Sequence, residues 1–389
     1  MDLIYQKATL TIAPILGKDA NQTLPGVRDN SRPVLMMIET IAGVPILATL
    51  SDLDHLLSKS VYESRAWTFQ ERILSTACVF FHEKQIFFHC QSTTRAECSS
   101  YVSVNHTERM SPTIFRRYSD NALPDYKQIL EYHNLVTVYS RRQMSYPVDA
   151  LNAFSGTMAL CERLGFGRFL YGLPHTFFDY ALLWVSLARA KERRLVSPSV
   201  SSVSEGVSFP SWSWASIDGG VRFDMLGHLE ELLTITSSIE RFVLHSQGSS
   251  QKVIRRYDSH DGDTQQSSMN DLPLDPVELV FETPFVQGDH FACKRCMVYG
   301  YLPSEDIEPG YVYYFPDGSR YTDYVANNNN HGLIELCQFF AHKTVHDYSI
   351  VMLMIIGWRG RCAYRLGIGM IGALSWEYAK PAWRTIRLR

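Results

Sequence analysis

The chain has 389 residues, of which 46% are hydrophobic and 20% charged, and its formal net charge at pH 7 is −3. This composition excludes global disorder and is sufficient for two folded domains with sizeable cores. A net charge this small, with only short basic clusters, provides no electrostatic basis for binding nucleic acid or an anionic membrane.

Residues 1–195 combine predicted strands and helices. A short strand is expected over 9–13, and two buried strands over 78–81 and 86–90 are expected to form a hairpin. Helical spacing of apolar residues and capping signals predict helices over 125–141, from an N-cap at Asp149 to about 163, and over 176–193.

A further helix is predicted around the run Trp67-Thr68-Phe69-Gln70-Glu71-Arg72. Its apolar stripe contains Tyr62, Ala66, Phe69 and Ile73. Polar groups inside a packed helix mostly satisfy hydrogen bonds. We therefore expect Trp67 to be mostly buried, and Glu71 to bond to backbone or to a basic side chain rather than line an open cleft.

The C-terminal part is predicted to be rich in strands. A Ser- and Val-rich linker over 196–208 leads into residues 209–389, in which a polar segment over 246–276 is expected to be a flexible insertion. Pro and Gly separate many of the predicted strands, which favours a barrel or a sandwich. These strands are expected over 209–222, 232–244, 279–286, 294–302, 310–314, 333–342, 348–356 and 362–368.

The segment from Pro210 to Trp214 contains two tryptophans one residue apart. In a strand, Trp212 and Trp214 would lie on the same face. Such a pair can form a platform for a ligand, but packing inside the protein is the favoured interpretation. A buried indole N–H needs an acceptor, and Ser211 or Ser213 is expected to provide one.

The sequence contains no convincing motif for a metal or a cofactor. Cys293 and Cys296 form a single C-x-x-C without a second pair, which is weak evidence for zinc. The stretch 367–372 matches G-x-G-x-x-G, but too few residues follow it for a βαβ unit, and we expect a Gly-rich strand end. A G-x-S-x-G nucleophile elbow is absent. We therefore expect no metal and no cofactor.

No secretion signal or membrane helix is predicted. The N-terminus lacks the charged start and apolar core of a signal peptide. The longest apolar run, over 350–357, is far shorter than the roughly 20 residues that a membrane helix needs. These observations predict a cytoplasmic protein.

The run from Trp67 to Arg72 resembles the W-T-x-Q-E-R block of the fungal heterokaryon-incompatibility (HET) family, with Trp67, Gln70, Glu71 and Arg72 at the motif positions. Other segments resemble further blocks of that family in its usual order. These segments are 146–156, which includes Asp149; 182–184; 210–216, which includes Pro210, Trp212 and Trp214; 364–369; and 381–388. One such block is weak evidence, but several in order are strong.

The resemblance implies a fold. The HET domain usually opens with two strands that this sequence lacks, and residues 1–13 resemble a segment that follows those strands. We therefore expect a truncated chain that begins inside that domain. The expected fold is α+β: residues 1–195 form the remnant of an open α/β, TIR-like HET domain with helices, and 209–389 form a β-rich barrel- or sandwich-like domain.

The resemblance also implies a function. HET proteins act in nonself recognition and programmed cell death, so we expect a signalling role through interactions with other incompatibility or signalling proteins. TIR domains are viewed as distant relatives, and some cleave NAD with a glutamate. Glu71 is the weak catalytic candidate for that alternative. Structural bridging by Glu71 is favoured, and we expect this shortened chain to be non-catalytic.

Overall fold

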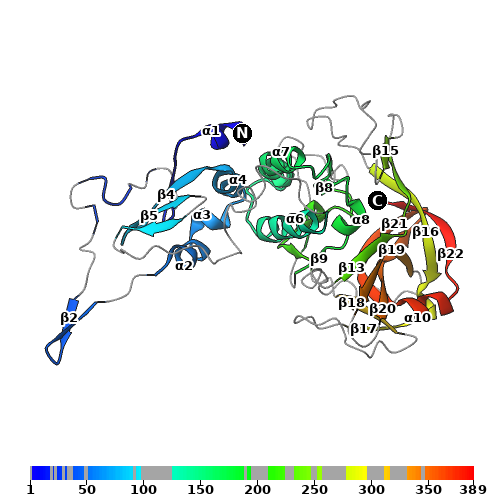
Figure 1. Ribbon diagram of the computed structural model, residues 1–389. Coiled ribbons are helices and arrows are strands. Elements are labelled where there is room, and N and C mark those ends of the chain that lie inside the picture. The colour runs from blue at the N-terminus through cyan, green and yellow to red at the C-terminus, as the bar shows by residue number, and fades with distance from the viewer. Residues whose placement is uncertain are drawn as a thin grey trace. The chain divides into compact units, whose positions relative to one another are not determined.

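The computed structural model in Figure 1 is a mixed α+β protein. It divides into two compact units. Unit 1 contains residues 1–123 and 142–164, and unit 2 contains 124–141 and 165–389. The expected linker over 196–208 lies outside the described residues. The structure describes residues 2–17, 21, 24–28, 31–32, 38–47, 51–90, 93–97, 125–187, 191–193, 209–223, 232–246, 252–255, 277–295, 311–315, 331–342 and 347–389.

Unit 1 is built on a mixed sheet with the strand order β1-β4-β5-β6, in which only β1 and β4 run parallel. The expected hairpin is confirmed as β4 and β5. Its strands are buried on one face rather than throughout, because Phe80 and Phe87 are buried while Phe88 is exposed. The strands are β1 (Thr11–Pro14), β4 (Ala77–Phe81), β5 (Ile86–Cys90) and β6 (Thr94–Ala96).

Short helices cover the buried face of this sheet. Asp52 and Ser60 cap α2 and α3 by accepting hydrogen bonds from the backbone N–H groups three residues later. Leu53 and Leu57 of α2 and Tyr62 of α3 pack on the sheet. The helices of unit 1 are α1 (Asp2–Lys7), α2 (Leu53–Ser58), α3 (Val61–Ser64), α4 (Trp67–Leu74) and α7 (Ser155–Arg163).

Asp149 does not have the capping role that we expected. It lies inside the 3₁₀ helix η1 (Pro147–Ala150), which is followed by a second one, η2 (Asn152–Phe154). Phe154 is the N-cap of α7 and has no side-chain capping bond. The Asp149 carboxylate instead accepts a hydrogen bond from the Asn152 amide at 3.3 Å. The helix α7 ends before Gly165, which has φ +88°, and this agrees with the predicted end at about residue 163.

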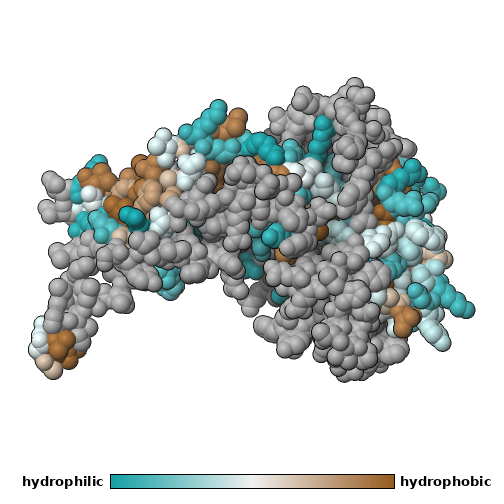
Figure 2. All heavy atoms as spheres, viewed as in Figure 1, coloured by the Kyte–Doolittle hydropathy of each residue, from teal (hydrophilic) through white to brown (hydrophobic). Residues whose placement is uncertain are grey.

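Unit 1 also contains a hairpin that we did not predict, formed by β2 (Ile38–Ile41) and β3 (Val44–Leu47). The two turn residues Ala42 and Gly43 both have positive φ, as a type I′ hairpin turn requires. Ile41 and Val44 are exposed, and Figure 2 shows a hydrophobic area at this tip.

The helical part of unit 2 differs from the prediction. The expected helix over 125–141 is confirmed as α6 (Asp125–Ser140). The expected long helix over 176–193 is wrong: only the single turn α8 (Phe178–Ala181) forms, and β9 (Val185–Ser186) and β10 (Lys191–Glu192) follow it. Leu182, Leu183 and Trp184 are all buried, so this apolar run has no periodicity that distinguishes a helix from other buried structure.

A large, mostly antiparallel sheet forms most of the C-terminal part of unit 2. Its strand order is β13-β19-β20-β21-β22-β16-β14-β15, with β17 and β18 attached through β21. β16 also pairs with β19. β21 and β22 meet at the single residue pair Ala363–Leu388, so the sheet is not a closed barrel. The strands are β13 (Leu232–Ser237), β14 (Arg241–Ser246), β15 (Lys252–Arg255), β16 (Val277–Gln287), β17 (Ala292–Arg295), β18 (Tyr311–Phe315), β19 (His331–His342), β20 (Asp347–Arg359), β21 (Cys362–Gly372) and β22 (Ala382–Leu388).

Three features of this region correct the sequence-based expectations. β15 lies inside the segment 246–276 that we expected to be a flexible insertion, and it pairs with β14; residues 247–251 and 256–276 lie outside the described residues. The expected strand over 209–222 is instead a turn, the 3₁₀ helix η3 (Trp214–Ser216) and two short strands after it, β11 (Ile217–Asp218) and β12 (Val221–Arg222). The helix α10 (Ala373–Tyr378) and the strand β22 were not predicted.

Among the helices that the structure describes, none has both the length and the apolar composition that crossing a membrane requires.

Candidate functional site

The polar residues of the W-T-x-Q-E-R segment lie beside a break between two helices of unit 1. We expected one continuous helix, but Arg65 is extended (φ −85°, ψ 138°) and separates α3 from α4. The backbone N–H of Ala66 donates to the Gln143 carbonyl oxygen at 2.9 Å, and Gln143 N–H donates to the Ser64 carbonyl oxygen at 2.6 Å. A segment almost 80 residues away in sequence therefore satisfies the backbone at the break.

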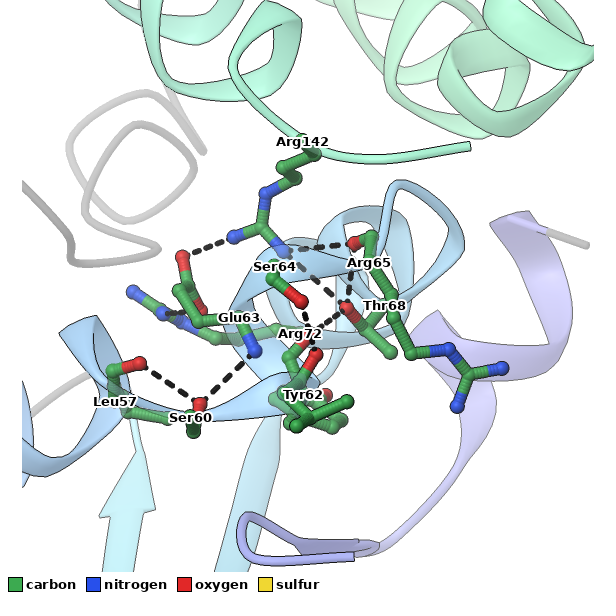
Figure 3. A network of polar contacts seen from close by, with 10 residues as sticks. Leu57, Ser60, Tyr62, Glu63, Ser64, Arg65, Thr68, Arg72 and Arg142 are labelled. Carbon is green, nitrogen blue, oxygen red and sulfur yellow. Dashed lines mark hydrogen bonds and ion pairs between the residues drawn. The ribbon is translucent and has the colours of Figure 1, made fainter. Parts of the chain in front are cut away.

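Three charged side chains meet at this break (Figure 3). The Glu63 carboxylate pairs with Arg72 at 2.6 Å through one oxygen and with Arg142 through the other. The side chains of Glu63, Arg72 and Arg142 are 11%, 9% and 4% exposed. Charge-assisted hydrogen bonds are stronger than neutral ones, and removing one partner of a buried pair leaves an uncompensated charge.

Arg142 also holds the broken backbone in place. One guanidinium nitrogen donates to the Arg65 carbonyl oxygen at 3.1 Å and to Thr68 Oγ1 at 3.2 Å (Figure 3). Thr68 Oγ1 in turn donates to the Arg65 carbonyl oxygen at 2.8 Å. The guanidinium lies 5.0 Å from the centre of the Phe69 ring. Because both Glu63 oxygens are bound to guanidinium groups, this carboxylate is suited to a structural role and not to proton transfer.

Glu71 lies outside this triad and has a different partner from the one expected. Its half-buried carboxylate accepts a hydrogen bond from the hydroxyl of Tyr5 in α1, rather than from backbone or a basic side chain. Burial raises the pKa of Glu71, while the charge of Arg65 and the Tyr5 hydrogen bond oppose that shift. Burial, the Glu71 charge and this hydrogen bond raise the pKa of Tyr5.

Gln70 joins two of the sequence blocks that carry the family resemblance. It is buried, and its Oε1 accepts the backbone N–H of Gly156 at 3.2 Å. A Cβ atom at Gly156 would lie 2.7 Å from Gln70 Oε1, so only glycine allows this approach. The block around residue 70 and the block at 146–156 therefore meet inside unit 1.

Trp67 is less buried than we expected, since it is half-buried while Phe69 is 3% exposed and stacks on Phe154 at 5.9 Å between ring centroids. We expect Phe69→Ala to lower the free energy of unfolding by about 3–5 kcal/mol, as large core truncations do. Trp67→Ala should cost less than half of that. Urea unfolding of both variants measures the difference, and equal costs would place Trp67 in the core after all.

His89 is a buried, uncharged histidine of the unit 1 core. Burial, with a smaller contribution from the Arg72 charge, lowers its pKa to about 4. Its Nδ1 lies 2.8 Å from Thr94 Oγ1. On β4, Cys78 pairs in register with His89, and burial raises the pKa of the Cys78 thiol to about 11. A thiol with this pKa is unreactive at neutral pH.

The lowered pKa predicts that acid destabilises unit 1. The unfolded chain binds a proton at His89 near pH 6.5, and the folded chain does so near pH 4. The contribution of neutral His89 to the free energy of unfolding is therefore fully present above pH 6.5. It is lost as the pH falls from 6.5 towards 4, by up to about 3 kcal/mol. Unfolding midpoints at pH 7 and 4.5 test this, and His89→Gln should flatten the dependence. An equally steep dependence in His89→Gln would refute the assignment to His89.

The second cluster of family-motif residues lies in unit 2. Trp212 and Trp214 are both buried, as expected for packing rather than a ligand platform. The expected serine acceptors are wrong: Trp214 Nε1 donates to the Tyr132 hydroxyl at 3.1 Å and to the Gly172 carbonyl oxygen at 3.2 Å. Trp212 Nε1 has no hydrogen-bond acceptor among the described residues.

Pro210 and Ser211 connect this segment with the last strands. The Pro210 carbonyl oxygen accepts Ser213 N–H at 2.9 Å, which turns the chain into η3. Ser211 N–H donates to the Arg389 carbonyl oxygen at 3.2 Å, and Ser211 Oγ accepts Arg365 N–H at 3.3 Å. The Arg365 guanidinium stacks 3.5 Å from the centre of the Trp184 ring, whose Nε1 donates to the Trp212 carbonyl oxygen at 3.0 Å.

Sequence analysis missed Glu63, Arg142 and Gln143. The pattern Ser60-x-x-Glu63 is a capping box, which would have indicated a helix beginning at Ser60. No local signal indicates Arg142. Among the described residues, no group of three His, Cys, Asp or Glu side chains could hold a metal ion. Cys296 of the C-x-x-C lies outside them.

Neither the known protein-family models, nor the curated proteins, nor the solved structures include a match to this chain.

Proposed function

We propose that this chain is a heterokaryon-incompatibility-type protein that acts in fungal nonself recognition and programmed cell death through protein interactions. The proposal rests on the sequence blocks that resemble this family in order along the chain. The packing of these blocks supports it: Gln70 bonds Gly156 in unit 1, and Trp212 and Trp214 are core residues in unit 2. These motif residues serve the fold.

The proposal is tested by inducible expression in a filamentous fungus. Expression of the full chain is expected to increase the fraction of cells that take up a membrane-impermeant dye. The control is Trp214→Ala, which should accumulate without this effect because its unit 2 core is disrupted. If the full chain accumulates in folded form and dye uptake stays at the uninduced level, the proposal is wrong.

One observation favours the alternative, a TIR-like NAD-consuming enzyme or its remnant. Glu71 is a half-buried carboxylate whose pKa is raised by burial, and perturbed carboxylates are frequent at catalytic sites. We nevertheless expect no turnover, because the Tyr5 hydroxyl occupies this carboxylate. Purified protein incubated with NAD should release no more nicotinamide than Glu71→Gln. Release that Glu71→Gln abolishes would replace the interaction proposal by the enzymatic one.

A further inference from the structure

Over most of its length, one edge of β22 pairs with no strand among the described residues, and we call it the free edge of β22. It pairs with β16 over seven residues, from Ala382 to Leu388, but with β21 only at Leu388. If that parallel register is continued along β22 towards Ala382, it reaches the β20–β21 turn at Gly360 and Arg361. The residues of β22 opposite this turn have no β21 partner, because β21 begins only at Cys362. Of the strands that the structure describes, none pairs with this edge of β22 before Leu388.

The backbone groups on this edge can be assigned from two observations. Pro284 of β16 is opposite Trp383 and has no N–H, so this is a pair without mutual hydrogen bonds. Arg389 N–H donates to the Ala363 carbonyl oxygen at 2.9 Å, so the odd-numbered residues point away from β16. Trp383 and Thr385 therefore direct their N–H and C=O groups to the free edge.

Exposed aromatic and basic side chains surround this edge. Trp383 is 66% exposed, and Tyr378, at the end of α10, is 91% exposed. The stretch from Glu377 to Arg389 contains four basic residues and one acidic residue, although the whole chain has a net charge of −3. The exposed basic residues around the edge are Arg359, Arg361, Lys380, Arg384 and Arg387.

One of these charges is already paired within the protein, and two others stack on aromatic rings. Arg387 pairs with Glu278 at 3.3 Å. Arg384 lies 4.7 Å from the Phe285 ring centre and 4.9 Å from that of Trp358, and Arg359 lies 4.8 Å from that of Tyr364. Stacking leaves a guanidinium charged, so these arginines can still attract carboxylates.

We propose that an acidic segment of a partner protein binds in extended form along the free edge of β22. Backbone hydrogen bonds to Trp383 and Thr385 would add it as a strand, and its carboxylates would face Arg359 and Arg361. The indole of Trp383 gives it an apolar contact. The inference rests on the proposed function only in taking the partner to be a protein.

Charge and geometry favour this occupant over two others. A second copy paired through its own β22 would bring like basic side chains together, which is unfavourable. Single-stranded nucleic acid could use the basic and aromatic side chains, but it cannot supply a ladder of alternating N–H and C=O groups.

The test is a binding titration with fluorescein-labelled ten-residue peptides and the full chain. A peptide of alternating Glu and Val should bind, and one of alternating Lys and Val should bind at least about tenfold more weakly, because its charges are repelled. Raising the salt concentration should weaken binding of the Glu peptide. If the Glu peptide does not bind up to about 1 mM, or ten-residue poly-dT binds more tightly, the inference is wrong.

Two variants locate the binding to this edge. Thr385→Pro removes one N–H from the free edge without removing a backbone bond to β16. Thr385→Ala is its matched control, because both variants also lose the side-chain bond from Thr385 Oγ1 to Glu282 of β16 at 3.5 Å. Binding should fall at least about fivefold in the first and stay unchanged in the second. Arg359→Glu/Arg361→Glu, on the exposed turn, should weaken the Glu peptide by a similar factor. Equal affinities of all variants and the native chain would overturn the inference, whereas the fungal cell-death assay would be unaffected by that result.

Discussion

Replacing Trp214 by alanine is expected to lower the free energy of unfolding by about 3–5 kcal/mol. The indole is 1% exposed and contacts Tyr139 edge-on at 5.7 Å between ring centroids. Its N–H is shared by the Tyr132 hydroxyl and the Gly172 carbonyl oxygen, which would lose this donor. Neighbours cannot collapse into the space easily, because Gly172 already packs against the ring.

Urea unfolding followed by far-ultraviolet circular dichroism measures this cost without relying on tryptophan fluorescence. Trp383→Ala is the matched control, because it removes the same side chain from a position that is 66% exposed. That control should change stability by less than about 1 kcal/mol. If both variants unfold at the same urea concentration, Trp214 is not a core residue and the packing of unit 2 described above is wrong.

Replacing Glu63 by glutamine is expected to cost about 3–5 kcal/mol, because it leaves the buried Arg72 and Arg142 without their shared carboxylate. The control is Asp2→Asn, which breaks the more exposed pair between Asp2 and Arg163. Exposed ion pairs contribute about 0–1 kcal/mol, so this variant should be close to the native chain.

A double-mutant cycle separates the triad from general effects of substitution. Arg142→Met should destabilise the native chain, but cost at least about 1 kcal/mol less in the Glu63→Gln background, where its charge has lost its partner. Strictly additive effects would mean that the Glu63–Arg142 pair contributes no coupling. In that case the bonds from Arg142 to the Arg65 carbonyl oxygen and Thr68 would be the important ones.

Local patterns predicted those elements whose partners are close in sequence. The helix α6 and the hairpin of β4 and β5 follow from apolar spacing and from the polar turn between the strands. Most long strands of unit 2 were also predicted, because runs such as Ile350–Ile356 are rich in β-branched and other apolar residues. Strand pairing could not be predicted from local patterns, and β22 with its free edge was missed.

Errors occurred where burial is uniform or turns are tight. The run around Leu182 and Trp184 is apolar on every side, so it has no period that distinguishes a helix from an irregular buried segment. The tryptophans at 212 and 214 alternate as in a strand, yet Ser213 caps a 3₁₀ helix by accepting the N–H of Ala215 at 3.1 Å. Side-chain capping of this kind competes with extended structure.

By itself, the sequence determined the α+β class, many of the main strands and helices, and the burial of Trp212 and Trp214. Those properties depend on hydrophobicity and periodicity within a few turns of the chain. Only the tertiary structure decided that Arg142 would join Glu63, that Tyr5 would bind Glu71, and that α3 and α4 would be separate helices. The first two contacts join residues that are 79 and 66 positions apart. The break at Arg65 depends on a similar contact, the backbone bonds to Gln143. Burying these charges and backbone groups costs free energy unless each has its partner, and the partners meet only when the chain has folded.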